Sequence, residues 1–151
     1  MELKSIEDVK ILSKKFSQII QKGDLVFLYG EIGVGKTTFV RYLINHLEEE
    51  NGIKKSEVPS PTYNIVYDYG IKEIKILHYD LYRLKNYSDI LELGMFENSE
   101  NHIKIVEWPE LIKSKPKDRI DILFKYSKKE DSRKVKVSGL GKYKDYNFNE
   151  F

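Results

Sequence analysis

The sequence predicts an α/β fold with a mixed parallel and antiparallel sheet, and two observations support this prediction. The first is the apolar run 25–29, of buried-strand type, which leads into the glycine-rich segment 30–37 and then into an apolar pattern with helical spacing. The second is a pair of strand-like segments, 63–69 and 74–79, which turn near Gly70 and indicate an antiparallel hairpin. Strand, glycine-rich loop and helix in this order are typical of phosphate-binding proteins, so we expect a P-loop NTPase-like three-layer fold.

The first element expected is a helix that starts after the cap residue Ser5, continues to about residue 20 and ends at Gly23. The helix that follows the glycine-rich segment ends at Gly52, and two prolines then hold the segment 58–63 extended. The apolar positions of the first helix, which are expected to share one face, are Ile6, Val9, Leu12, Phe16, Ile19 and Ile20.

The second half of the chain is predicted to alternate short helical segments with strands. A short helix over 88–93 is expected, with Ser88 as its cap. Strands are expected over 103–106 and 119–126, and the segment 133–138 is expected to pair back onto the latter. These elements complete the sheet predicted from the first half.

Length and composition fit a single domain, which we assign to residues 1–138, followed by a polar tail, 139–151, that is expected to fray. The absence of cysteine excludes disulfides and thiolate metal sites. A net charge of +2 argues neither for nor against a nucleic-acid partner. No apolar run approaches membrane-spanning length and the N-terminus does not resemble a signal peptide, so a cytoplasmic protein without a membrane partner is expected.

The segment 30–37 fits G-x-x-x-x-G-K-[ST], the phosphate-binding P-loop. Its glycines let successive N–H groups turn toward phosphate oxygens, and the new helix adds its positive dipole end. In this motif Lys36 reaches the β- and γ-phosphates, and the Thr37 hydroxyl binds Mg²⁺. The alternative is a glycine-rich turn with a chance Lys-Thr pair. The predicted nucleotide-binding residues of the loop are Gly30, Glu31, Ile32, Gly33, Val34, Gly35, Lys36, Thr37 and Thr38.

Two strand ends supply acids that suit a phosphate site. Asp80 follows the strand 74–79, and Glu107 follows the strand 103–106. A P-loop requires a carboxylate at the end of a neighbouring strand to hold the magnesium shell, so we assign Thr37, Asp80 and Glu107 to the metal and Lys36, Asp80 and Glu107 to catalysis. The sequence leaves open which acid holds the metal and which positions water, and either could instead be a surface or capping acid.

Other polar residues allow two interpretations. Ser60 and Thr62 could form a switch-like loop that senses the γ-phosphate, or belong to a stiff connector into a strand. His78 could lie beside the metal site or be a structural histidine, and Arg83 could be a charge clamp or a surface residue. Trp108 could stack on a ligand or fill the core. A basic cluster could be a solvated edge or contact nucleotide, protein or RNA; it consists of Lys128, Lys129, Arg133, Lys134 and Lys136.

Several strings occur together in a spacing that resembles one family. They are the P-loop 30–38 with Phe39, then Ser-Pro-Thr-Tyr at 60–63, His-Tyr-Asp-Leu-Tyr-Arg-Leu at 78–84, Leu-Gly at 93–94 and Val-Glu-Trp-Pro at 106–109. In this combination the chain resembles the TsaE family, also called YjeE, from its first helix to about residue 135. Two departures stand out: Val34 replaces the family's usual alanine, and the first helix lacks a threonine that is usual near its start.

This resemblance implies a compact α/β fold with a mixed sheet, and slow hydrolysis of ATP in the presence of Mg²⁺. It implies that the partners are TsaB and TsaD, of which TsaD transfers a threonylcarbamoyl group to the adenosine beside the tRNA anticodon. Hydrolysis by this family depends on the assembled complex and supports repeated cycles of the transfer, while tRNA is met only indirectly. It also implies the Walker B role for Asp80, a magnesium or catalytic role for Glu107, a switch-like role for Thr62, a place near the nucleotide for Trp108, and base contacts near Arg133 and the first helix start.

Two rival functions remain open at this stage. A small P-loop kinase would need a lid and an acceptor pocket, and the sequence has no arginine-rich lid segment. A nucleotide-gated binding module would hydrolyse ATP only incidentally. The sequence lacks an Asn-Lys-x-Asp guanine signature, which favours ATP as the nucleotide.

Overall fold

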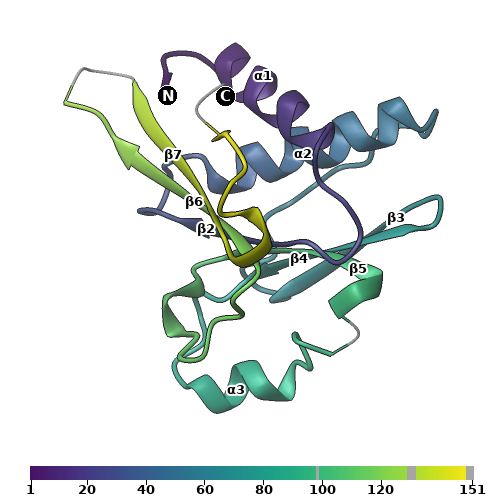
Figure 1. Cartoon of the computed structure of the whole chain (residues 1–151), viewed down its shortest axis with the longest axis vertical. Helices are drawn as coiled ribbons and strands as arrows, with labels where there is room; N and C mark the ends of the chain where they lie inside the picture. The colour runs from purple at the N-terminus through teal and green to yellow at the C-terminus, as the bar shows by residue number, and fades with distance from the viewer. Residues whose placement is uncertain (98, 129–131, 149–151) are drawn as a thin grey trace.

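The computed structural model describes residues 1–97, 99–128 and 132–148 (Figure 1). In chain order its helices and strands are β1 (Glu2–Leu3), α1 (Ile6–Ser17), β2 (Leu25–Tyr29), α2 (Lys36–Glu50), β3 (Val66–Ile71), β4 (Ile74–Asp80), α3 (Tyr87–Glu92), β5 (His102–Glu107), β6 (Arg119–Tyr126) and β7 (Arg133–Leu140). Short 3₁₀ turns lie at η1 (Ser99–Asn101), η2 (Pro109–Leu111) and η3 (Gly141–Tyr143). Within these described ranges no helix has both the length and the apolar character needed to cross a membrane.

The strands form one sheet of mixed direction, in the order β1-β7-β6-β2-β5-β4-β3. The central strands β6, β2, β5 and β4 run parallel, whereas β3 pairs with β4, and β7 with β6 and β1, in antiparallel fashion. Helices α1 and α2 cover one face of the sheet, and α3 lies on the other side (Figure 1). The predicted three-layer α/β fold with a mixed sheet and a β3–β4 hairpin is therefore confirmed.

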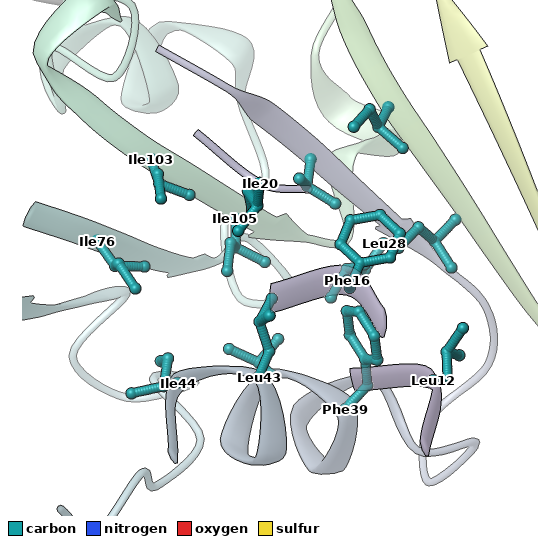
Figure 2. Packing of buried hydrophobic residues seen from close by; sticks show 14 of the residues in the cluster. Leu12, Phe16, Ile20, Leu28, Phe39, Leu43, Ile44, Ile76, Ile103 and Ile105 are labelled. Atoms are coloured by element: carbon teal, nitrogen blue, oxygen red, sulfur yellow. The ribbon is translucent and has the colours of Figure 1, made fainter. Parts of the chain in front are cut away.

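The larger core lies between the sheet and the α1–α2 pair (Figure 2). Phe16 of α1 meets Phe39 of α2 edge to face, with ring centroids 5.5 Å apart, and both rings are fully buried. Ile103 and Ile105 of β5 present the apolar surface on which α2 packs. This core fixes the start of α2 relative to the ends of the central strands, which is where the candidate site lies.

Several boundaries differ from those predicted. The Ser5–Asp8 capping box starts α1 as expected, but the helix ends at Ser17, and Ile6 at its first position is 52% exposed instead of sharing the buried face. The third strand begins only at Val66, because Ile65 has a left-handed backbone with a φ of 67°. The cap of α3 is Asn86 rather than Ser88. The two-residue strand β1 was not predicted, since it is too short to show a periodic pattern.

The C-terminal segment differs most from the prediction, because residues 139–148 are ordered against the body of the protein. Strand β7 continues through Leu140, and the Tyr143 hydroxyl donates a hydrogen bond to the buried Asp24 carboxylate. Burial and this hydrogen bond raise the pKa of Tyr143. Phe148 is 9% exposed and stacks on Phe16 with ring centroids 6.5 Å apart. The expected fraying therefore does not apply to 139–148, and residues 149–151 lie outside the described part of the chain.

We predict that Phe148→Ala lowers the free energy of unfolding by about 2–3 kcal/mol, somewhat less than for a phenylalanine at the centre of a core, because one side of this ring is at the rim. Urea denaturation followed by circular dichroism measures the change. The control is Leu91→Ala on α3, whose side chain is 56% exposed and which should change the free energy by less than about 0.5 kcal/mol. Equal stability of Phe148→Ala and wild type would mean that the tail contributes nothing.

Candidate phosphate and metal site

The P-loop lies between β2 and α2 and leaves the first turn of α2 open. Gly35 caps this helix with a left-handed backbone, φ 113°, and the cap makes no side-chain hydrogen bond. The first turn also contains no acidic residue. The unpaired N–H groups and the positive end of the helix dipole therefore face the space in front of the loop, which suits an anion such as phosphate.

Gly30 is needed at the start of the loop for a steric reason. A Cβ atom at this position would lie 2.4 Å from the backbone oxygen of Phe124 in β6, and the residue has a φ of 135°. The Tyr126 hydroxyl, from the end of the same strand, donates to the Ile32 carbonyl oxygen at 3.0 Å. Strand β6 thus contacts the loop at Gly30 and at Ile32.

Lys36 is buried, and its ammonium is held over the loop. The Nζ atom donates to the carbonyl oxygens of Gly30 at 2.6 Å and Glu31 at 3.0 Å, and lies 3.9 Å from the centre of the Trp108 ring. Burial lowers the pKa of Lys36, and the nearby negative charge of Glu107 counteracts part of this effect. Each contact is made to a neutral acceptor or a ring, so the positive charge has no direct carboxylate partner within the described structure.

A cavity of about 230 Å³ lies in front of the loop and α2. It brings together most of the residues that the sequence assigned to phosphate, metal and switch roles. Its lining consists of Ile32, Gly33, Gly35, Lys36, Thr37, Thr38, Ser60, Thr62, Asp80, Tyr82, Glu107 and Trp108. Of these, Tyr82 was not predicted. Glu31 is exposed and does not line the cavity, and it contributes instead through its backbone carbonyl.

The two predicted acids stand side by side at the ends of adjacent parallel strands. Asp80 of β4 and Glu107 of β5 are Cα partners in the ladder and are 3% and 2% exposed. The Thr37 hydroxyl lies 2.8 Å from Oε1 and 3.0 Å from Oε2 of Glu107, and donates to this carboxylate. Two carboxylates and the P-loop hydroxyl therefore converge on one wall of the cavity.

The proline-containing loop contacts the second acid. The Thr62 hydroxyl donates to Asp80 Oδ2 at 2.6 Å, and Ser60 lies within hydrogen-bonding distance of both Thr62 and Asp80. The Tyr82 backbone N–H donates to the other oxygen, Oδ1, at 2.9 Å. Ser60 and Thr62 are thus in direct contact with a predicted metal residue.

The oxygen donors at this wall fit a Mg²⁺ ion shared with phosphate better than a metal ion bound by protein ligands alone. Hydroxyl and carboxylate oxygens are the ligands that Mg²⁺ prefers, and this ion usually keeps several waters and uses substrate phosphates. Within the described residues, no group of three or more His, Cys, Asp or Glu side chains is placed to hold a metal. Thr37, Asp80 and Glu107 therefore offer part of a coordination shell that phosphate oxygens would complete.

A second cavity, of about 390 Å³, adjoins the first across the P-loop and shares Gly33, Gly35 and Thr38 with it. Its other walls come from the first strand and the start of α1, with Ser5 and Ile6, and from Arg133 at the start of β7. The two places predicted for base contacts are therefore next to each other and next to the loop. The exposure of Ile6 also finds an explanation here, because its side chain forms part of a cavity wall.

Some residues with predicted roles lie in other surroundings than those predicted. Arg83 does not line the phosphate cavity; its guanidinium lies 4.9 Å from the centre of the Tyr63 ring. Of the basic cluster, Arg133 lines the second cavity and Lys134 and Lys136 are exposed, whereas Lys129 lies outside the described residues. Trp108 adopts a left-handed backbone, φ 58°, and its ring lies over the Lys36 ammonium. The Tyr82 ring packs on the Trp108 ring, with ring centroids 4.8 Å apart.

Comparison with known proteins decides the family. The family model described as "Threonylcarbamoyl adenosine biosynthesis protein TsaE" matches residues 3–135. The chain belongs to the TsaE family. The TsaE protein of Rickettsia felis is 40% identical over 111 residues, which cover 74% of this chain and 63% of that protein, and the TsaE protein of Aquifex aeolicus is 35% identical over 140 residues, 89% of this chain and 92% of its own.

The match to the rickettsial relatives is partial in length. The aligned part spans less than two thirds of the Rickettsia felis and Rickettsia conorii proteins, 63% and 61% respectively. The crystal structure of YdiB from Bacillus subtilis is similar to this TsaE-family chain with a TM-score of 0.71 at 24% identity, covering 94% of this chain and 85% of that one. At this identity the likeness supports the fold alone.

We predict that two alanine substitutions in the P-loop lower the free energy of unfolding by different amounts, one through backbone strain alone and the other through strain and a clash. Gly35→Ala has open space but a φ of 113°, so it should lower the free energy of unfolding by about 1–2 kcal/mol through backbone strain alone. Gly30→Ala adds a clash with the Phe124 backbone and should cost about 2–5 kcal/mol. Urea denaturation measures both.

Gly70→Ala is the control for these variants, because Gly70 has no left-handed φ and no atom within 4 Å of the added methyl group. Its free energy of unfolding should stay within about 1 kcal/mol of wild type. A Gly35→Ala variant that is less stable than Gly30→Ala would contradict the packing of the loop on β6.

Proposed function

We propose that this protein is the ATP-binding and ATP-hydrolysing subunit of the tRNA threonylcarbamoyladenosine modification complex, and that it supports repeated turnover by TsaB and TsaD. The observation that carries the ATPase part is a single cavity in which the open start of α2, Lys36 and the paired acids Asp80 and Glu107 converge. Membership in the TsaE family supports the pathway. We further propose that the protein acts in the cytoplasm and meets tRNA only through the complex.

Phosphate binding follows from the electrostatics of the loop. No side chain caps the start of α2, so its first N–H groups can donate to phosphate oxygens without displacing a side-chain acceptor. The Lys36 ammonium is already within the cavity wall, and its contacts to Gly30 and Glu31 carbonyls can be exchanged for contacts to β- and γ-phosphate oxygens. Exchange of neutral acceptors for charged ones strengthens each hydrogen bond.

Thr37, Asp80 and Glu107 are the residues that would hold Mg²⁺. The ion, when bound, supplies charge neutralisation at the β- and γ-phosphates. The direct Thr37–Glu107 contact favours Glu107 as the carboxylate nearest to the ion, and the contacts of Asp80 to Thr62 and Ser60 connect the proline-containing loop to the same wall. One of the two carboxylates orients the attacking water by accepting its hydrogen bond, which assists formation of the new bond to phosphorus as the bond to ADP breaks.

The second cavity is our proposed site for the nucleoside part of ATP. It adjoins the phosphate cavity through shared loop residues and is bounded by Ser5 and Ile6 on one side and Arg133 on another. Ser5 and Ile6 offer polar and apolar contacts at the start of α1, and Arg133 can stack or donate to a base. The absence of an Asn-Lys-x-Asp sequence supports adenine rather than guanine as that base.

We predict that Lys36→Ala reduces ATP affinity at least tenfold, since a charge-assisted contact to phosphate is worth about 1.5–3 kcal/mol. Isothermal titration calorimetry with MgATP measures the change. Lys54→Ala, at an exposed lysine of the loop after α2, should bind ATP as wild type does. Unchanged affinity of Lys36→Ala would contradict the assigned phosphate site.

We predict that Glu107→Gln, studied in complex with TsaB and TsaD, retains ATP affinity within a few-fold but lowers the rate of phosphate release by about 10²-fold or more. Use of γ-labelled ATP follows the fate of the phosphoryl group. Release of label to water supports an ATPase, while its transfer to an acceptor molecule would favour a kinase. Full tRNA modification turnover by Glu107→Gln would make the hydrolysis incidental, as in a binding module.

A further inference from the structure

A buried histidine lies directly behind the two acids, on the sheet face that α2 covers. Alternate residues of β4 and β5 form two parallel rows on this face, and the cross-strand partners are Ile76 with Ile103, His78 with Ile105, and Asp80 with Glu107. His78 is 0% exposed and stands between an apolar pair and the acidic pair. The neighbouring positions deeper in the row are isoleucines, so packing alone would be served by an apolar side chain here.

His78 reaches diagonally to the carboxylate of the neighbouring strand. Its Nε2 atom lies 2.8 Å from Glu107 Oε1, the same oxygen that lies 2.8 Å from the Thr37 hydroxyl. Its other ring nitrogen, Nδ1, is buried and has no hydrogen-bond partner within the described structure. The imidazole therefore makes one polar contact, and that contact is made to Glu107.

The chemistry of the two groups places the ring proton. An ionised carboxylate only accepts hydrogen bonds, so the Nε2 atom that faces Glu107 must carry the hydrogen. The neutral tautomer with Nε2–H leaves Nδ1 as a lone pair, which agrees with its lack of an acceptor. Glu107 is thus held from the core side by His78 and from the P-loop side by Thr37.

The hydrogen bonds from Thr37 and from His78 to Glu107 would respond differently to the binding of Mg²⁺ and ATP. The Thr37 hydroxyl is itself a proposed metal ligand, so its hydrogen bond to Glu107 competes with that role. The His78 contact comes from inside the sheet and faces away from the phosphate side. His78 is the support that can keep Glu107 in one orientation throughout the reaction, in the way that outer-shell residues orient metal-binding carboxylates.

We propose that His78 is a positioning residue that fixes the orientation of the Glu107 carboxylate through a hydrogen bond from Nε2–H. This inference rests on the proposed ATPase function, and it assigns His78 no contact with nucleotide. It distinguishes His78 from a histidine that merely fills the core, because loss of the donor should impair the reaction without impairing nucleotide binding.

Two substitutions at this position separate the hydrogen bond from the packing. His78→Leu introduces an apolar side chain of similar bulk and removes the donor, whereas His78→Gln keeps an N–H at a comparable reach. In the complex with TsaB and TsaD we expect His78→Leu to lower kcat for ATP hydrolysis about 10–100-fold, with KM and the ATP dissociation constant within about threefold of wild type. His78→Gln should recover most of the lost kcat.

The matched control is Ile76→Val, two residues earlier in the same row, which alters packing without touching a polar group. It should leave kcat within about twofold of wild type, and thermal unfolding shows that each variant is folded. An unchanged kcat in His78→Leu would overturn the proposal. Equal impairment of the Gln and Leu variants would do the same, because the donor would then be irrelevant.

A second measurement tests the contact without any activity. In ¹⁵N-labelled protein, the ring signals of His78, assigned by their absence from His78→Gln, should report a proton on Nε2. Glu107→Ala should shift these signals. A proton on Nδ1 with none on Nε2 would overturn the proposal. If wild-type complex released no phosphate from ATP, the ATPase assignment would fail, and this spectrum would still decide the His78–Glu107 contact.

Discussion

The parallel pairing of β2 with β5, and of β5 with β4, is the constraint on which the candidate site depends. Parallel strands end at the same edge of a sheet, and ligands of open α/β sheets bind beyond that edge. Here the P-loop follows β2, Glu107 ends β5 and Asp80 ends β4, so all three lie at the same edge of the sheet. A shift of one residue in either pairing would turn one of the acids to the opposite face.

The core on the α1–α2 side holds this arrangement together. Phe16 and Phe39 lock the two helices to each other, and the buried isoleucines of β5 fix α2 above the sheet. Since α2 begins at Lys36, directly at the site, any tilt of the helix would move the phosphate-binding N–H groups relative to the acids. The C-terminal segment adds Phe148 to the same core, where this ring packs on Phe16 of α1. Residues near both ends of the sequence therefore help to position α2.

The sequence predicted those parts of the protein that have local signals. The P-loop, the acids at strand ends and the β3–β4 hairpin are each readable from a motif or a period within a dozen residues. Features that depend on distant contacts could not be read in this way: the two-residue strand β1, the packing of Phe148 on Phe16, and the stacking of Arg83 on Tyr63. The sequence leaves the role of His78 open, because its hydrogen-bond partner lies on another strand, 29 residues away.

The proline-containing loop is held to β4 by two contacts near its C-terminal end. Thr62 donates to the Asp80 side chain, and the Asp80 backbone N–H donates to the carbonyl oxygen of Ile65 at 2.8 Å. Ile65 holds a left-handed backbone that costs a β-branched residue about 1–3 kcal/mol, so this junction is maintained by its surroundings rather than by its own preference. A change in the hydrogen bonds of Asp80 therefore affects the loop directly.

A different consequence follows from the single tryptophan of the chain, Trp108, whose ring lies 3.9 Å from the Lys36 ammonium. Indole emission responds to a nearby charge, and no second indole contributes background, so the intrinsic fluorescence of the unlabelled protein reports on the position of that lysine.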